Sequence, residues 1–241
     1  MKILGIIPAR FASTRFPGKP LIDIGGKTMI RRVYEQAKKA ASLSDVIVAT
    51  DDQRIYDEVI SFGGKVVMTA SHHQNGSERC AEASINIPAD AVINIQGDEP
   101  FIHSEQIDTL AALFADPACQ IGTLIKVCND RALLEKPSII KVTVDKNLKA
   151  LYFSRSVIPY IRNIDTYTAF YKHIGIYGYR IDVLKEITKL KATPLELAES
   201  LEQLRWLENG YSIQTAVTTH ESISIDTPED LEKVKSLIDI G

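Results

Sequence analysis

The stretch KILGIIPARFASTRFPGKP, residues 2–20, begins as an apolar run and continues as a basic segment interrupted by prolines. The run at residues 2–7 is rich in isoleucine and leucine, which is typical of a strand buried on both faces of a parallel sheet. Prolines at positions 8, 17 and 20 prevent a continuous helix in the segment that follows. The stretch therefore predicts a buried strand whose carboxyl end leads into an irregular loop.

Similar apolar runs recur through the first half of the chain and alternate with helix-like segments. The further runs are Val46–Thr50, Lys65–Thr69 and Ala91–Ile95, and the segments between the runs are Thr28–Ala40, Gln53–Phe62 and Ser77–Ile85. Alternation of buried strands with amphipathic helices is typical of a parallel sheet covered on both faces. We predict an α/β fold built on an open, doubly wound, mostly parallel sheet.

The second half of the chain has a different pattern. From about Ile121 the strand-like segments become longer, and we expect Gly122–Cys128, Ile139–Val144 and Leu148–Ser154 to form part of a second lobe. Thr193-Pro194 and Thr227-Pro228 each place a capping threonine before a proline, with an acidic residue shortly after, which is a strong helix start. We predict one helix that ends near Asn209-Gly210 and another that closes the chain.

Composition excludes several classes of protein. The 241 residues include 28 basic and 31 acidic side chains, and the net charge of −3 argues against a general binder of nucleic acids or membrane surfaces. Cys80, Cys119 and Cys128 show no CxxC spacing, so we predict neither a disulfide framework nor a zinc site. The first apolar run is too short for a signal peptide or a membrane span. We therefore expect a protein of the reducing cytoplasm.

Two familiar phosphate-binding motifs are incomplete in this chain. The glycine-rich dinucleotide fingerprint should follow the first strand, where Pro8-Ala9-Arg10 stands instead. The triplet Gly26-Lys27-Thr28 resembles the end of a P-loop, but Leu21 occupies the place of the required earlier glycine. We therefore interpret the triplet as a turn into a helix.

The basic loop remains a candidate site for a phosphorylated ligand. Arg10, Arg15 and Lys19 follow a strand at its carboxyl end, where open α/β sheets bind their ligands. Charged donors form the stronger hydrogen bonds to phosphate, and arginine can bind two oxygens at once. A triphosphate could engage all three side chains, whereas the plainer interpretation is a solvated basic loop.

Acidic residues are expected at the same sheet edge. VINIQGDEPFI, residues 92–102, ends a buried strand with Asp98 and Glu99, and Asp226 closes the apolar run 223–225. Carboxylates at such a place could hold Mg²⁺ together with phosphate oxygens. An ordinary acidic turn explains the first segment equally well, and an aspartate before a helix start is common.

A third polar segment, HHQNGSER at residues 72–79, joins a predicted strand to a helix. Gln74, Asn75, Ser77 and the amides around Gly76 could bind a ligand, and Arg79 adds a positive charge. The adjacent histidines have no matching cluster of ligands nearby in the sequence, so we do not predict a histidine-based metal site.

Seven segments, in order across nearly the whole chain, resemble the 3-deoxy-manno-octulosonate cytidylyltransferases, or CMP-Kdo synthetases. They are PARFASTRFPGKPL, HQNGSER, NIQGDEPFI, LYFSRSVIPY, HIGIYGYR, LEQLR and IDTPEDLE. The resemblance implies a Rossmann-like layered sheet of the nucleotide-diphospho-sugar transferase type with an inserted sugar-binding and dimerisation lobe. The core would comprise about residues 1–120 and 212–241, and the lobe about 121–211. A homodimer acting on CTP and the acidic sugar Kdo in lipopolysaccharide biosynthesis is expected.

The resemblance also implies roles for individual residues. For the nucleotide they are Arg10, Ser13, Arg15, Lys19, Gln74, Ser77 and Arg79. For the sugar they are Gln96, Arg155, His173, Tyr177, Glu202 and Gln203. Asp98 and Asp226 would be the Mg²⁺ ligands and, with Arg15 and Lys19, the catalytic residues. The sequence departs from the family pattern at residues 75–77 and 222–225. These departures affect the details of two loops and not the resemblance as a whole.

Three other functions remain to be separated from this one. A CMP-sialate synthetase would share the layout, although LYFSRSVIP and HIGIYGYR favour Kdo. An NAD-dependent oxidoreductase is disfavoured by the missing glycine fingerprint. A catalytically inactive nucleotide-binding regulator would be expected to lack a carboxylate or Lys19, and this chain retains them. The sequence does not distinguish Kdo from a close variant such as an 8-amino form, and it identifies no general base.

Overall fold

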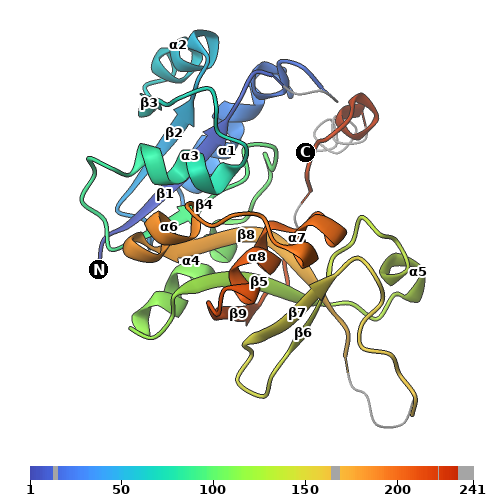
Figure 1. Ribbon diagram of the computed structural model, residues 1–241. Coiled ribbons are helices and arrows are strands. Elements are labelled where there is room, and N and C mark those ends of the chain that lie inside the picture. The colour runs from blue at the N-terminus through green and yellow to red at the C-terminus, as the bar shows by residue number, and fades with distance from the viewer. Residues whose placement is uncertain (13–15, 164–168, 222, 233–241) are drawn as a thin grey trace.

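A computed structural model describes residues 1–12, 16–163, 169–221 and 223–232 (Figure 1). The strands are β1 (Ile3–Ala9), β2 (Asp45–Thr50), β3 (Val66–Met68), β4 (Ala91–Asn94), β5 (Ile121–Val127), β6 (Lys141–Val144), β7 (Ala150–Ser154), β8 (Tyr171–Arg180) and β9 (Ile213–Val217). The helices are α1 (Met29–Ala37), α2 (Gln53–Ser61), α3 (Gly76–Ala83), α4 (Ser104–Ala112), α5 (Arg131–Leu134), α6 (Ile181–Ile187), α7 (Pro194–Glu199) and α8 (Glu202–Glu208), with 3₁₀ turns η1 (Lys19–Leu21) and η2 (Leu113–Ala115). Residues 228–232 are also helical.

The central sheet has the strand order β3-β2-β1-β4-β8-β5-β9. The first four strands are parallel neighbours, and β5 and β9 are parallel to each other. Strand β8 lies between β4 and β5 and runs antiparallel to both. Six of these seven strands therefore share one direction, which confirms the predicted mostly parallel α/β fold.

Strand β1 separates two hydrophobic cores, because successive side chains of a strand point to opposite faces. Ile3 and Ile7 belong to the core that includes residues of α1, α2 and α4, and Leu4 and Ile6 belong to the core that includes residues of α3, α6 and α8. Figure 1 shows the helices arranged around the sheet. Among the described helices, none is long and apolar enough to cross a membrane.

The strand at residues 121–127 does not lie where the sequence pattern suggested. It was expected in the second lobe, but β5 pairs with β8 on one side and with β9 on the other, inside the central sheet. Among the described strands, those of the β6–β7 hairpin alone lie off the main strand path, and Figure 1 shows the hairpin projecting beside β8 and β9. The length of a strand does not indicate which part of the sheet it joins, because pairing with strands far apart in the chain decides this. The proposed division into core and lobe remains a prediction.

The helix expected to run from Thr193 to about Asn209 is in fact two helices. Its start is confirmed, since Thr193 is the N-cap of α7 and its amide donates to Glu196 Oε2 at 3.2 Å. The chain then turns at Ser200, which has φ 51° and ψ 51°, before α8 begins. The two helices are buried differently, because Leu197 of α7 is 68% exposed whereas Leu204 of α8 is buried.

Candidate active site

A polar cavity opens at the carboxyl ends of β1 and β4. Its walls come from the basic loop, the segment before α3, the turn after β4 and the segment before the last helix. The lining residues are Pro8, Ala9, Arg10, Lys19, Pro20, His73, Gln74, Asn75, Gly76, Arg79, Gln96, Gly97, Asp98 and Asp226. The cavity thus lies at the sheet edge where ligand binding was expected.

Lys19 forms ion pairs with two carboxylates in this cavity. Its Nζ lies 2.7 Å from Asp98 Oδ2 and 3.1 Å from Asp226 Oδ1. The three side chains are only 15%, 27% and 34% exposed, so water screens their charges less than on an open surface. Two carboxylates separated by 128 positions in the chain (226 − 98) are therefore held around a single cation.

The backbone explains why these side chains converge. Gly18 has φ +73°, which favours glycine, and it precedes the 3₁₀ turn that carries Lys19. The turn after β4 packs tightly on β1, because a Cβ at Gly97 would lie 2.8 Å from the carbonyl oxygen of Pro8. The amide of Ile225 donates to the carbonyl oxygen of Asp98 at 3.0 Å, which brings the Asp226 segment to the same edge.

The segment before α3 is organised by its own side chains. Asn75 is the N-cap of α3, and its Oδ1 accepts hydrogen bonds from the Glu78 amide and the Ser77 hydroxyl, both at 2.9 Å. Ser77 is buried, and its hydroxyl oxygen also lies within hydrogen-bond distance of the Glu202 carboxyl group. Asn75 is thus a good capping residue at the start of α3.

Arg79 reaches the cavity wall, but its guanidinium group binds protein groups. It donates to Thr69 Oγ1 at 2.6 Å and to Asp51 Oδ2 at 3.2 Å, and the residue is only 3% exposed. In this conformation Arg79 ties α3 to the ends of β2 and β3. Direct binding of a nucleotide by Arg79 remains a prediction.

Several of the predicted sugar-binding residues, among them His173 and Tyr177, form a second polar cluster outside the cavity lining. His173 Nε2 lies 2.8 Å from Thr123 Oγ1, and the His173 and Tyr177 rings are 5.2 Å apart. Burial lowers the pKa of His173 to about 3, so the imidazole is neutral near pH 7. The Tyr177 hydroxyl is buried and has no hydrogen-bond partner among the described residues. Gln96 connects the cavity to this cluster, because its Nε2 donates to the Gly175 carbonyl at 3.0 Å.

Glu202, at the start of α8, places its carboxyl group close enough to Tyr177 to affect it electrostatically. Burial raises the pKa of its carboxyl group, and the hydrogen bond from Ser77 opposes that shift. A raised folded-state pKa means that the protonated form stabilises the fold, and that this contribution is lost as the pH rises through the raised pKa. The ionised carboxylate is therefore less compatible with the fold than the neutral acid.

We predict that Glu202→Gln raises Tm at pH 7, because the amide removes a partly desolvated charge. The expected rise is about 2–4 °C, which corresponds to about 1 kcal/mol in a chain of this size. The difference should shrink as the pH falls through the ordinary pKa of a glutamate, because the carboxyl group then takes up a proton in both the folded and the unfolded state. Thermal unfolding at both pH values measures it, and Glu208→Gln, exposed on the same helix, is the control. An unchanged Tm at pH 7 would contradict this role of burial.

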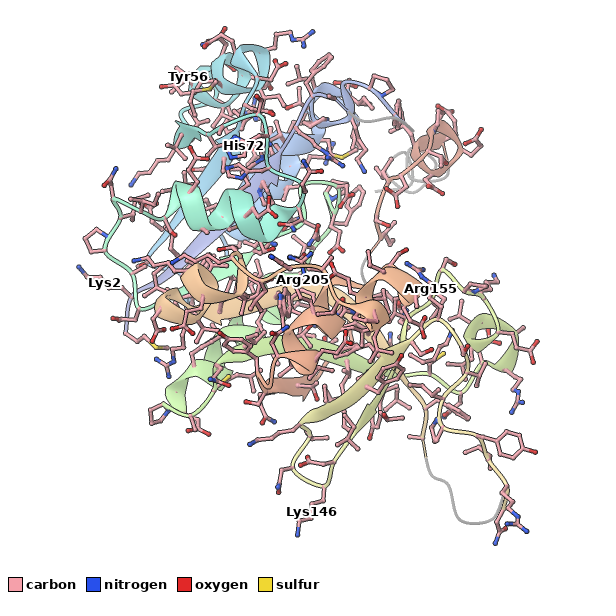
Figure 2. The ribbon with its side chains drawn as sticks, viewed as in Figure 1. Lys2, Tyr56, His72, Lys146, Arg155 and Arg205 are labelled. Carbon is pink, nitrogen blue, oxygen red and sulfur yellow. The ribbon has the colours of Figure 1, made fainter. Side chains whose placement is uncertain are left out.

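Arg155 lies at the junction of α7 and α8 and not on the cavity wall (Figure 2). Its guanidinium group donates to the carbonyl oxygens of Pro137 at 2.9 Å, Glu199 at 2.6 Å and Ser200 at 3.3 Å. Carbonyl groups at the end of a helix lack intrahelical partners, so Arg155 satisfies part of the α7 terminus. It thereby supports the turn that precedes Glu202.

A buried lysine completes this junction. Lys141 is 0% exposed, and its Nζ donates to the carbonyl oxygens of Ile139 at 2.7 Å, Lys136 at 3.3 Å and Arg155. Burial lowers the pKa of this ammonium group. No sequence motif indicated this role, because the carbonyl oxygens become neighbours only in the folded chain.

We predict that Lys141→Met lowers the free energy of unfolding by about 1–3 kcal/mol, because the carbonyl oxygens would lose their donor in a buried place. Urea unfolding measures this loss. Lys146→Met is the matched control, since Lys146 is exposed at the turn of the same hairpin (Figure 2). Equal stability of the two variants would contradict a structural role of the Lys141 ammonium group.

The structure brings some predicted residues together and separates others. Those that line the cavity are Arg10, Lys19, Gln74, Arg79, Gln96, Asp98 and Asp226. Those that do not line it are Ser77, Arg155, His173, Tyr177, Glu202 and Gln203, the last being buried in α8. Ser13 and Arg15 lie outside the described residues. His73 also lines the cavity and was not predicted to do so, although it lies in the polar segment 72–79 that joins a strand to a helix.

The structure agrees with our interpretation of Gly26-Lys27-Thr28 as a turn into a helix. Thr28 is the N-cap of α1, and its hydroxyl donates to Glu58 Oε1 at 2.7 Å. Lys27 forms an ion pair with Glu35 at 2.6 Å and does not line the cavity. Both side chains thus stabilise α1 and its contacts with neighbouring residues.

Known proteins resemble this chain over its whole length. A family model described as cytidylyltransferase matches residues 4–223. A 3-deoxy-manno-octulosonate cytidylyltransferase of Parabacteroides distasonis is 56% identical over 99% of this chain and 98% of that protein. A protein of the same name from Cytophaga hutchinsonii is 56% identical over 97% of this chain and 96% of its own length.

Solved structures agree with these sequence matches. The structure of a CMP:2-keto-3-deoxy-manno-octonic acid synthetase complexed with CTP has a TM-score of 0.95 and 44% identity, covering 100% of this chain and 99% of that one. A 4-diphosphocytidyl-2C-methyl-D-erythritol synthase from Anaerococcus prevotii, with a TM-score of 0.63 and 13% identity over 99% and 98% of the two chains, shows the same fold. With relatives of one name that are about half identical over nearly its whole length, this chain belongs to the 3-deoxy-manno-octulosonate cytidylyltransferase family.

Proposed function

We propose that this protein transfers the CMP group of CTP to Kdo and releases pyrophosphate. The observation that carries the proposal is the arrangement of Lys19 between Asp98 and Asp226 in a polar cavity at the sheet edge. The names of the relatives indicate the substrates. CTP is bound in the solved structure that has a TM-score of 0.95 with this chain.

Positive charge in the cavity suits the triphosphate of CTP. Arg10 and Lys19 line the cavity on the side of the basic loop, and the segment before α3 lines it with Gln74 and Asn75. Phosphoryl transfer depends mainly on positioning and on neutralising the charge of the phosphate oxygens. Lys19 would stabilise the departing pyrophosphate, and the resemblance extends this role to Arg15 and adds Ser13 to the phosphate contacts.

Asp98 and Asp226 fit a divalent cation by the chemistry of their donor atoms. Each places a carboxylate oxygen within 3.1 Å of the same Lys19 Nζ, so both oxygens face one cationic position. Mg²⁺ is commonly held by one or two carboxylates together with substrate phosphates. When bound, it would supply charge neutralisation at the phosphates of CTP.

The proposed reaction is a direct displacement. The anomeric oxygen of Kdo forms a bond to the α-phosphorus of CTP, and the bond from that phosphorus to the bridging oxygen of pyrophosphate breaks. The anomeric hydroxyl group releases its proton to solvent in this step. Lys19 neutralises charge on the leaving group, while the cavity positions CTP for attack by the sugar.

The second polar cluster is the proposed place for the sugar. Gln96 lines the cavity and also binds β8, so it adjoins both regions. The unpartnered Tyr177 hydroxyl, the neutral His173 and the Glu202 carboxyl group offer hydrogen bonds to sugar hydroxyls. Gln203 is proposed by resemblance. Arg155 would act through the α7–α8 junction in the observed conformation, and binding of the Kdo carboxylate by it remains a proposal.

The test is a pyrophosphate-release assay with CTP and Mg²⁺, with and without Kdo. We expect release that depends on both substrates, and a panel with 8-amino-Kdo and sialic acid identifies the preferred sugar. Kdo-independent release, or a preference for sialic acid, would contradict the proposal. A cytoplasmic homodimer that serves lipopolysaccharide biosynthesis also stays a prediction of the resemblance.

A further inference from the structure

A group of potential metal ligands lies away from the cavity described above. The donor atoms of His103, Glu105 and His220 all lie within 4.8 Å of one another. The two imidazole rings stack with their centroids 4.2 Å apart and an interplanar angle of 24°. Among the described residues, this is the one group of at least three histidine, cysteine, aspartate or glutamate side chains with such a spacing. None of the three lines the cavity.

The three ligands come from two segments that meet only in the folded chain. His103 is the N-cap of α4, Glu105 lies in its first turn, and His220 follows β9 at a distance of 117 positions from His103 (220 − 103). Helix α4 begins just after the turn that carries Asp98, and the chain beyond His220 leads to Asp226. The cluster therefore joins the two segments that supply the carboxylates of the cavity.

The neighbouring contacts hold the His220 segment in place without using the cluster. Glu221 pairs with Lys126 of β5 at 2.8 Å and with Lys172 of β8. The Thr218 amide donates to the Ile125 carbonyl at 2.9 Å. His220 is thus presented between two anchored residues, and Glu221 is engaged by lysines and is not counted among the ligands.

We propose that His103, Glu105 and His220 bind a transition-metal ion of the Zn²⁺ type. Imidazole nitrogen and carboxylate oxygen form a common donor set for zinc with three protein ligands, whereas Mg²⁺ prefers oxygen ligands. Donors around a tetrahedral zinc lie about 3.3 Å apart, given Zn–N bonds of about 2.0 Å. His103 and Glu105 are exposed and His220 is partly exposed, so their side chains can close this gap by changing rotamer.

Such an ion would tie the start of α4 to the segment after β9. The Ile225 amide already donates to the Asp98 carbonyl, so the bound metal would reinforce an existing junction between the segments that carry Asp98 and Asp226. The predicted result is stabilisation of the protein by mass action, because the ligands are close together only in the folded state. This site is separate from the Asp98 and Asp226 pair and does not depend on the proposed reaction.

The experiment titrates Zn²⁺ into the purified full chain in the presence of excess Mg²⁺, which occupies oxygen-only sites. We expect one zinc ion at this site and a rise in Tm with zinc concentration. Co²⁺ in place of zinc should give the visible absorption of a site with nitrogen ligands. His103→Ala and His220→Ala should each weaken zinc affinity by more than about 100-fold, since even the loss of an outer-shell partner costs 10–100-fold. Glu105→Gln should weaken it less.

His72→Ala is the matched control, because His72 (labelled in Figure 2) is also exposed and does not belong to the cluster. It should bind zinc like the wild type and keep the cobalt spectrum. All variants should remain folded when metal is removed by a chelator, and the rise in Tm with zinc is measured for each variant against its own metal-free Tm. Equal zinc affinity of the wild type, His103→Ala and His220→Ala would overturn the proposal. Absence of zinc-dependent stabilisation in the wild type would do so as well.

Discussion

Asp98→Asn should lower kcat/KM for CTP by about 10³-fold, which is the scale for losing a group that organises charge in phosphoryl transfer. Asp226→Asn should have a similar effect. Both carboxylates face Lys19 Nζ at 2.7 and 3.1 Å, so each helps to define the same cationic position. Asparagine keeps the size of the side chain but removes the negative charge that a divalent cation requires. Initial rates of pyrophosphate release at saturating Mg²⁺ give the measurement.

The control is Asp57→Asn, an exposed carboxylate on α2 that lies away from the cavity. It should retain wild-type turnover. Thermal unfolding should show that both site variants remain folded, because each leaves Lys19 one carboxylate partner. Near-normal turnover of either site variant at saturating Mg²⁺ would show that the carboxylate is not a metal ligand in the reaction.

Lys19→Met should lower kcat by about 10²–10³-fold, the usual cost of removing one charge-stabilising donor. The ammonium group is 15% exposed and lies between two carboxylates, so its loss leaves like charges facing each other. We expect the loss to persist at saturating CTP, because the lysine is proposed to act on the leaving pyrophosphate. Lys19→Arg should recover part of the rate by restoring the charge.

Lys27→Met tests whether Lys27, in the triplet that resembles the end of a P-loop, takes the phosphate-binding role that we assign to Lys19. Lys27 is 41% exposed and pairs with Glu35 outside the cavity, so its replacement should leave kcat within about twofold, as exposed ion pairs contribute little. If Lys27→Met abolished turnover while Lys19→Met did not, the assignment of the phosphate-binding lysine would be wrong. Both variants should be compared in the same pyrophosphate assay.

Local patterns predicted much of the secondary structure. The apolar run at residues 2–7 became β1, and the capping threonine at 193 began α7 as expected, because both signals depend on neighbours in the chain. The break at Ser200 was not predictable in the same way. The carbonyl oxygens at that turn are satisfied by Arg155, which is 45 positions away in the chain.

The types of residue in the candidate site were easier to predict from the sequence than their arrangement in space. Arg10, Lys19, Asp98 and Asp226 follow strands or apolar runs, so the sequence could assign them to one edge of a parallel sheet. It could not show that Arg155 faces the α7–α8 junction. That outcome depends on which carbonyl groups remain unpaired after folding, and no pattern of neighbouring residues encodes it.

By itself, the sequence determined the family, the α/β class and the strand-end positions of the cations and carboxylates, because these follow from local periodicity and ordered motifs. Only the tertiary structure decided that β5 lies inside the sheet beside an antiparallel β8. It also decided that Lys19 meets a carboxylate 207 positions away and that His103 meets His220. These contacts depend on strand order and on how loops close over the sheet edge, and long-range packing sets both.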